Sequence, residues 1–153
     1  MDTAYKTTLE LDKVLARAVQ LCACQETKEM MQALEPAPTI EDERYDLAQT
    51  NAINALLIKN GSPRFGSVRE VRRIVAHARK GGILSMGELL EIAATLRNFS
   101  GLSQWYGLSE HEMLPTDDLF FSLAPQPVLE KQISESILSP EEMADTASVT
   151  LHD

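Results

Sequence analysis

The sequence has few aromatic residues, two cysteines and no long apolar run. Phe, Trp and Tyr make up 5% of 153 residues, so the core must consist mainly of Leu, Ile, Val, Ala and Met. Gly and Pro number seven each and gather at a few places, which favours a few long elements over many short strands. We therefore expect residues 1–153 to form a single all-α domain, an irregular bundle of about five to seven helices.

The small number of cysteines and the lack of long apolar runs indicate in which cellular compartment the protein is found. One residue separates Cys22 from Cys24, a spacing that disfavours a disulfide, and free thiols are typical of a reducing compartment. No second Cys or His pair follows at the spacing of a zinc finger, which favours packing cysteines over a metal site. No signal peptide opens the sequence, and no run approaches the roughly 18 to 20 apolar residues of a membrane span. We expect a cytoplasmic protein without membrane contact.

Basic residues are outnumbered, and the formal net charge is −9. A free-standing nucleic-acid-binding protein is usually basic, so this charge argues against strong nucleic-acid binding by the chain alone. The charge is unevenly distributed, however. Residues 59–80 contain seven bases and one acid, whereas residues 107–153 contain ten acids and one base.

No catalytic constellation is evident. Gly81-Gly82 is not followed by the Gly-Lys-Ser/Thr of a phosphate-binding loop, which favours a helix-ending role for these glycines. His77, His111 and His152 lack the partners of a catalytic triad, and acids at helix starts usually offset the helix dipole. The sequence thus predicts a non-catalytic chain without metal or cofactor. A small hydrolase with an unrecognised carboxylate pair is an alternative.

Helical periodicity and helix-ending residues divide the chain into segments. Apolar residues recur at three- and four-residue spacing, and Pro36, Asn60-Gly61 and Gly81-Gly82 end helical stretches. The predicted helices cover residues 9–34 with a break near Cys24, 40–59, 68–80 and 86–106, with two shorter helices after Thr116 and from Pro127 to Ile133. Residues 136–145 could form a small β-hairpin or a loop with one helical turn.

Several capping and packing details follow from single residues. Thr39 and Ser67 are predicted N-caps, and Ser85 with Glu88 has the pattern of a capping box. Trp105-Tyr106, at the end of the longest helix, is predicted to lie in the core. One face of the helix over 40–59 carries mostly small residues and is predicted to pack closely on another helix. This small-residue seam comprises Tyr45, Ala48, Ala52, Ala55 and Leu56.

The bases of the predicted helix over 68–80 form the one functional surface that the residues suggest. The candidate nucleic-acid contacts are Arg69, Arg72, Arg73, Arg79 and Lys80. At about 100° per residue all but Arg79 gather on one side, away from most of the apolar positions. The side chains could form a solvated face, pair with the acidic C-terminal half, or neutralise the phosphates of a nucleic acid without recognising bases.

Three stretches together resemble the N-terminus of the second bacterial MutS paralogue, the MutS-two family. They are Leu11-Asp12-Lys13-Val14-Leu15, the loop from Gly61-Ser62-Pro63-Arg64 to Val71, and the run Ala78-Arg79-Lys80-Gly81-Gly82-Ile83-Leu84-Ser85 followed by Glu88-Leu89-Leu90. The third is the most specific, because a Lys-Gly-Gly turn before a serine cap is a distinctive order. The likeness spans residues 9–148.

This resemblance implies a segment of a longer protein. The family is a dimeric ATPase that uses ATP and Mg²⁺ and usually carries a C-terminal Smr nuclease domain. Its members are associated with mismatched or branched DNA, suppression of recombination and stalled ribosomes. The resemblance therefore implies a structural core or lever segment, with DNA, the ribosome and a second copy as partners of the full-length protein. Residues 149–153 contain no helix-ending signal, which also predicts a longer chain. An independent helical protein-binding module is the second alternative.

Overall fold

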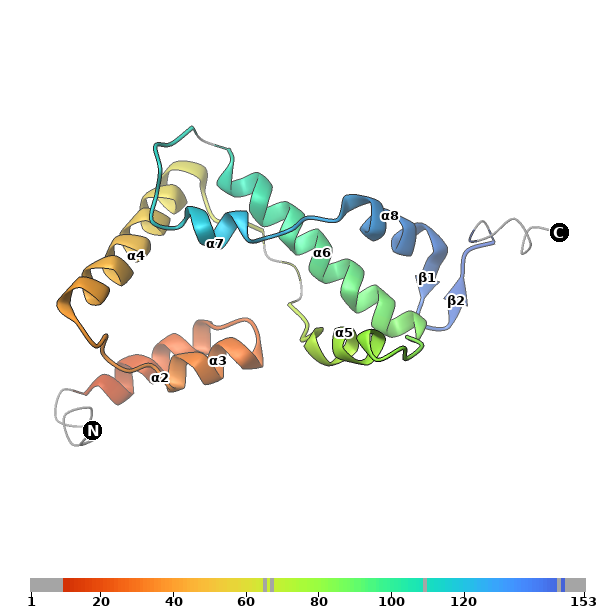
Figure 1. Ribbon diagram of the computed structural model, residues 1–153, viewed down its shortest axis with the longest axis horizontal. Helices are drawn as coiled ribbons and strands as arrows, with labels where there is room; N and C mark the ends of the chain where they lie inside the picture. Colours follow the sequence, from red (N-terminus) through yellow and green to blue (C-terminus); the bar gives the residue numbers. More distant parts are fainter. Residues whose placement is uncertain (1–9, 65, 67, 109, 146, 148–153) are drawn as a thin grey trace. The chain divides into compact units, whose positions relative to one another are not determined.

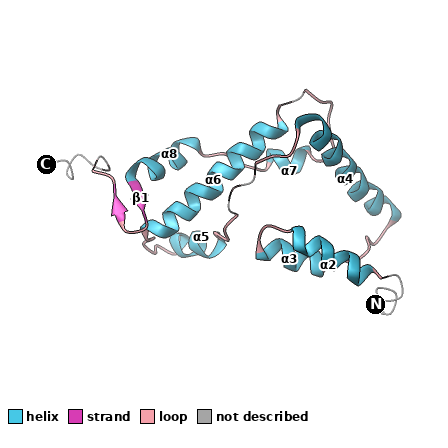
Figure 2. Cartoon of the chain, turned by 180° about the vertical axis from the view of Figure 1, so that it is seen from behind, coloured by secondary structure: helices cyan, strands magenta, loops and turns pink. Residues whose placement is uncertain are grey.

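A computed structural model of the chain describes residues 10–64, 66, 68–108, 110–145 and 147 (Figure 1). The described residues are mainly helical with one small antiparallel hairpin, so the predicted all-α class is confirmed (Figure 2). Internal contacts divide the chain into two compact units, Met1–Ala37 and Pro38–Asp153. No described helix combines the length and the apolar composition that a bilayer-spanning segment needs.

The described residues of the first unit form two short helices, α2 (Leu11–Leu21) and α3 (Gln25–Gln32). The chain breaks between them at Cys22–Cys24, as predicted. Both cysteines are free, and the Cys22 thiol donates to the carbonyl of Ala18 at 3.4 Å. Among the described residues, no group of three His, Cys, Asp or Glu side chains could hold a metal ion. The thiols therefore have local polar contacts and form no disulfide.

The second unit begins with α4 (Ile40–Asn60), whose two ends match the prediction. The Thr39 hydroxyl accepts a hydrogen bond from the backbone N–H of Asp42 at 3.1 Å and satisfies one of the free amides of the first turn. At the other end, Gly61 adopts a positive φ of 73°. This conformation is accessible to glycine at little energetic cost because glycine has no side chain.

A helical pair follows, α5 (Arg72–Arg79) and α6 (Met86–Tyr106). The predicted capping box of α6 is confirmed. The backbone N–H of Ser85 donates to the Glu88 carboxylate at 2.7 Å, and the N–H of Glu88 donates to the Ser85 hydroxyl at 3.3 Å. The backbone hydrogen bond from Ser85 is the main reason that the pKa of Glu88 lies below its usual value.

The chain ends with α7 (Asp117–Phe121), α8 (Pro127–Ser136) and a two-stranded hairpin of β1 (Ile137–Ser139) and β2 (Glu142–Met143). The strands are antiparallel, with Ile137 opposite Met143. Both short helices begin where the sequence predicted, although α8 continues beyond Ile133 to Ser136. Of the two alternatives left open for residues 136–145, the structure forms the hairpin. Thr116 precedes α7 as expected, but its side chain makes no capping bond.

Helix α6 supports two separate hydrophobic clusters, one in each half. Its first half packs on α8 and β1 around Ala93, Ile133 and Ile137. Its last turn supplies Trp105 and Tyr106, which are 6% and 3% exposed and pack against Leu56. The prediction that this aromatic pair belongs to the core is confirmed.

The predicted small-residue seam of α4 was largely wrong. Ala48 and Ala55 are exposed, and Tyr45 is 49% exposed. Leu56, the last member of the predicted seam, does pack on Trp105 and Tyr106, and its neighbours in that contact are the half-buried Ile53 and Leu57. Large aromatic rings need branched apolar partners to fill the space beside them, so the buried face of α4 is rotated from the small residues toward the bulky ones.

Candidate nucleic-acid interface

Helix α5 presents bases at both ends and buries a single side chain. Ile74 is buried, whereas Arg72, Arg73 and Arg79 are exposed. Lys80 is also exposed and is the C-cap residue of the helix. The bases thus lie on the exposed part of α5, apart from its buried side chain.

The helix is shorter than predicted, and Arg69 lies outside it. The sequence indicated a helix from Val68, whereas α5 begins at Arg72. The predicted cap, Ser67, lies outside the described residues. Val71 stands at the N-cap position without a side-chain acceptor, and the first turn contains no acid, so the observed start of α5 has neither of the usual helix-start signals. Arg69 is exposed in the irregular segment before the helix and does not share its face.

The bases at the two ends of α5 differ in their effect on the helix. Arg79 lies in the last turn, where a positive charge is favourable because the helix dipole is negative there. Arg72 and Arg73 lie in the first turn, where the same dipole disfavours a cation. The helix dipole therefore accounts for a base at position 79, and it does not account for the bases at positions 72 and 73.

The basic side chains do not pair with the acidic C-terminal half within the described part of the chain. There, Arg73, Arg79 and Lys80 have no carboxylate within ion-pair distance. The long-range ion pair that does reach the C-terminal half joins Arg97 on α6 to Glu130 on α8. Of the three roles that the sequence left open, pairing with those acids is not observed for these three bases. A solvated face and a phosphate-binding face remain.

A tight connection leads from the basic helix to α6. Backbone N–H groups of Lys80 and Gly82 both donate to the carbonyl of His77 at 3.1 Å, and that of Gly81 donates to Ala78 at 2.9 Å. Gly81 has a positive φ of 83°, which favours glycine. The glycines thus end α5 as predicted, and they fix Lys80 at the edge of the turn.

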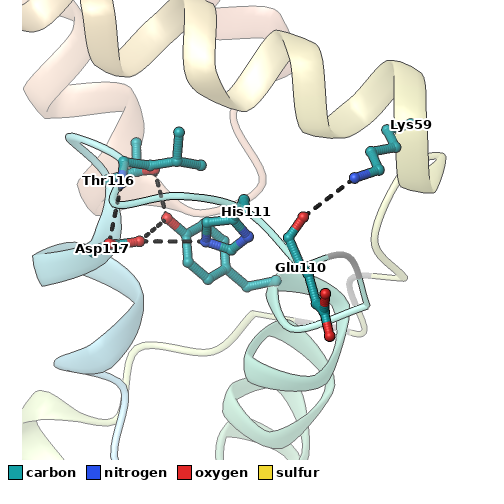
Figure 3. A network of polar contacts seen from close by, with 7 residues as sticks. Lys59, Glu110, His111, Thr116 and Asp117 are labelled. Atoms are coloured by element: carbon teal, nitrogen blue, oxygen red, sulfur yellow. Dashed lines mark hydrogen bonds and ion pairs between the residues drawn. The ribbon is translucent and has the colours of Figure 1, made fainter.

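A second polar cluster, which the sequence did not reveal, joins the end of α6 to the start of α7 (Figure 3). The buried Tyr106 hydroxyl donates to Asp117 Oδ1 at 2.6 Å and lies 2.8 Å from the hydroxyl of Thr116, which is 0% exposed. The other carboxylate oxygen accepts from the backbone N–H of Leu114 at 3.1 Å, and His111 Nε2 lies 3.4 Å from Oδ1. In the sequence, the one feature that pointed to this cluster was Asp117 at the start of a helix. An acid at that position is equally well explained by the helix dipole.

The environment of this cluster is that of a structural contact. Burial and the neighbouring Asp117 carboxylate raise the pKa of Tyr106 to about 12, which keeps the phenol protonated near neutral pH. The hydrogen bond from Tyr106 lowers the pKa of Asp117. A protonated phenol and an ionised carboxylate that bond each other stabilise the fold and leave neither group poised for proton transfer at neutral pH.

The alternative of a carboxylate hydrolase would need two acids close together in a cleft. Two acids have lowered pKa values: Glu88 lies in the first turn of α6, whereas Asp117 on α7 bonds Tyr106 in the last turn of α6, roughly 27 Å further along that helix. A cavity of about 320 Å³ between α4, α6 and α7 is lined mainly by apolar side chains and contains no acid. Its lining residues are Ile53, Leu57, Ser62, Pro63, Leu102, Trp105 and Phe120.

Comparison with known proteins shows similarity to one kind of bacterial protein. Endonuclease MutS2 of Ruminiclostridium cellulolyticum is 31% identical over 153 residues, which cover 99% of this chain. Endonuclease MutS2 of Clostridium beijerinckii is 29% identical over 145 residues, covering 94% of the chain, and that of Halothermothrix orenii is 28% identical over 156 residues, covering 97%. No protein-family model matches the chain, and no solved structure matches it.

The match is to a segment of these relatives. The chain spans 19%, 18% and 20% of the three curated proteins, about a fifth of their length. The predicted resemblance to the MutS-two family is thereby confirmed: nearly the whole of this chain is similar to a segment of MutS2.

Proposed function

From this similarity we propose that the chain is a non-catalytic, structural core or lever segment of a cytoplasmic MutS-type protein that acts on nucleic acid. The parent protein would carry the ATPase, with ATP and Mg²⁺, and the nuclease, and it would act as a homodimer. Its substrates would be mismatched or branched DNA, with roles in suppressing recombination and at stalled ribosomes. The similarity to a segment of Endonuclease MutS2 supports the parent's class. The described residues support a structural role, because their polar clusters serve capping and packing.

We further propose that the bases around α5 contact the nucleic-acid backbone. The observation that carries this proposal is the pair Arg72 and Arg73, which are exposed in the first turn of a helix, where the helix dipole disfavours cations. Arg79 and Lys80 extend the positive surface to the other end of α5, and Arg69 extends it before the helix. Arginine side chains on such a face neutralise phosphates and orient a duplex without selecting its sequence.

The test is binding of a fluorescently labelled DNA duplex by this chain at low salt, followed by anisotropy over a series of salt concentrations. The paired reversal Arg72→Glu/Arg73→Glu should weaken binding and reduce the slope of log affinity against log salt by about two, since each lost phosphate contact contributes about 0.9. The matched control is Arg17→Glu/Arg44→Glu, which reverses two exposed arginines on α2 and α4 and changes the net charge equally.

Equal losses in the two variants would show that the chain responds only to net charge, and the interface proposal would be wrong. A loss confined to Arg72→Glu/Arg73→Glu supports it. Hydrolysis of ATP by this chain alone would contradict the non-catalytic role directly.

A further inference from the structure

The connection between α5 and α6 exposes an isoleucine. Ile83 is 93% exposed, the largest fraction among the large apolar side chains of the described residues. Single apolar residues are common on protein surfaces, so this exposure alone indicates little. The surroundings of Ile83 make it informative.

Ile83 follows the basic end of α5 directly. Arg79 and Lys80 are exposed and have no carboxylate partner in the described part of the chain, and only the two glycines separate Lys80 from Ile83. At Gly81 an added methyl group would meet no atom within 4 Å, so this side of the connection is open to solvent. The Cα atom of Ile83 therefore lies within about 11 Å of that of Lys80 and within about 14 Å of that of Arg79, given the reach of three- and four-residue segments.

The connection is also held on both sides. Before Ile83, the carbonyl of His77 accepts from the N–H groups of Lys80 and Gly82. After it, Ser85 and Glu88 form the capping box that begins α6. Ile83 is thus presented by a fixed turn, and ordering it on binding would cost less conformational entropy than ordering a loose loop.

We propose that Ile83 inserts between bases of a nucleic acid while Arg79 and Lys80 contact the flanking phosphates. This inference rests on the proposed backbone contact of α5. Isoleucine is among the side chains that proteins wedge between base steps, where it replaces part of the stacking surface. The occupant is a nucleic acid and not a protein, because the apolar group lies beside cations that a polyanion would neutralise, whereas charged residues are depleted at the centre of protein interfaces.

The experiment uses the 153-residue chain and a short A·T-rich DNA duplex in which 2-aminopurine replaces adenine at several steps. The fluorescence of 2-aminopurine rises when its stacking is disturbed, so it reports the wedge separately from binding. At saturating protein, Ile83→Ser should abolish the rise seen with the unchanged chain and weaken binding roughly tenfold, the effect expected for losing most of one buried apolar side chain. The salt dependence should not change, because no charge is altered. Ile83→Leu should retain the fluorescence rise.

Ile58→Ser is the matched control, because Ile58 is 79% exposed on α4, outside the basic region. It should leave both affinity and fluorescence unchanged. If the chain binds DNA through Arg72 and Arg73 but Ile83→Ser behaves as the unchanged chain, the wedge is refuted and the proposed function stands. If the chain does not bind DNA at low salt, both fail. A large fall in the melting temperature of the free chain on Ile83→Ser would show that this side chain packs within the fold, which also overturns the wedge.

Discussion

Replacing Tyr106 by phenylalanine tests whether the cluster between α6 and α7 holds the second unit together. The aromatic ring that remains in Tyr106→Phe keeps the stacking on Phe120, whose centroid lies 3.9 Å away, so only the hydroxyl is lost. Because that hydroxyl donates to Asp117, the Thr116 hydroxyl must be the donor in their shared bond. The substitution leaves the Thr116 hydroxyl, 0% exposed, without its acceptor.

The expected loss follows from these two effects. A lost hydrogen bond to a charged acceptor and a buried donor left without a partner together cost about 2 to 4 kcal/mol of unfolding free energy. For a domain of this size that lowers the melting temperature by roughly 5 to 15 °C. Urea unfolding followed by circular dichroism should give a lower midpoint with an unchanged m-value, since the buried area barely changes.

Tyr45→Phe provides the matched control, because the Tyr45 hydroxyl donates to the carbonyl of Pro115 at 3.0 Å while the side chain is 49% exposed. Water can replace that bond, so its loss should cost less than about 1 kcal/mol. Adding Thr116→Val to Tyr106→Phe removes the orphaned hydroxyl and should restore part of the stability. Equal costs for the two tyrosine substitutions would refute the reasoning, as would a double variant weaker than Tyr106→Phe.

Two further predictions concern ionisation and the glycine turn. The pKa of Tyr106 is raised from 10.0 to about 12, so its contribution to stability is complete below pH 10 and is lost as the pH rises toward 12. Far-ultraviolet circular dichroism should therefore show a loss of stability between pH 10 and 12 in the unchanged chain, and this pH-dependent loss should be smaller in Tyr106→Phe. A methyl group at Gly82 would overlap the His77 ring. In a His77→Ala background, Gly82→Ala should therefore stabilise the chain by about 0.4 to 1 kcal/mol, because alanine lowers the conformational entropy of the unfolded chain. The gain should be absent when His77 is present. Melting temperatures of the unchanged chain, the two single variants and the double variant test this difference.

The parts of the fold that the sequence predicts are those set by neighbouring residues. The caps at Thr39 and Ser85 depend on groups three residues away, and the stop at Gly61 depends on one backbone angle. The exposure of the bases on α5 was predictable for the same reason, since helical spacing alone places Arg72 about 160° and Arg73 about 100° away from Ile74 around the helix.

The parts that sequence could not predict depend on distant packing. Which face of α4 is buried is decided by Trp105, which lies 49 positions beyond Leu56 in the chain. The hydroxyl of Tyr106 and the carboxylate of Asp117 meet only because the chain reverses after α6. The late start of α5 was missed because the periodic apolar pattern already includes Val68 and Val71, and because Ser67 before them has the side chain of an N-cap.

The short segment 115–117 has a consequence for the order of folding. The carbonyl of Pro115 accepts hydrogen bonds from Tyr45 and Gln49 across sequence separations of 70 and 66 residues, while Thr116 and Asp117 bond Tyr106 across 10 and 11. Closing the longer loops costs more chain entropy than closing the shorter ones. We therefore expect α6 and α7 to associate first and to create the surface on which α4 docks. This makes α4 the element whose attachment is completed last, although it precedes both in the chain.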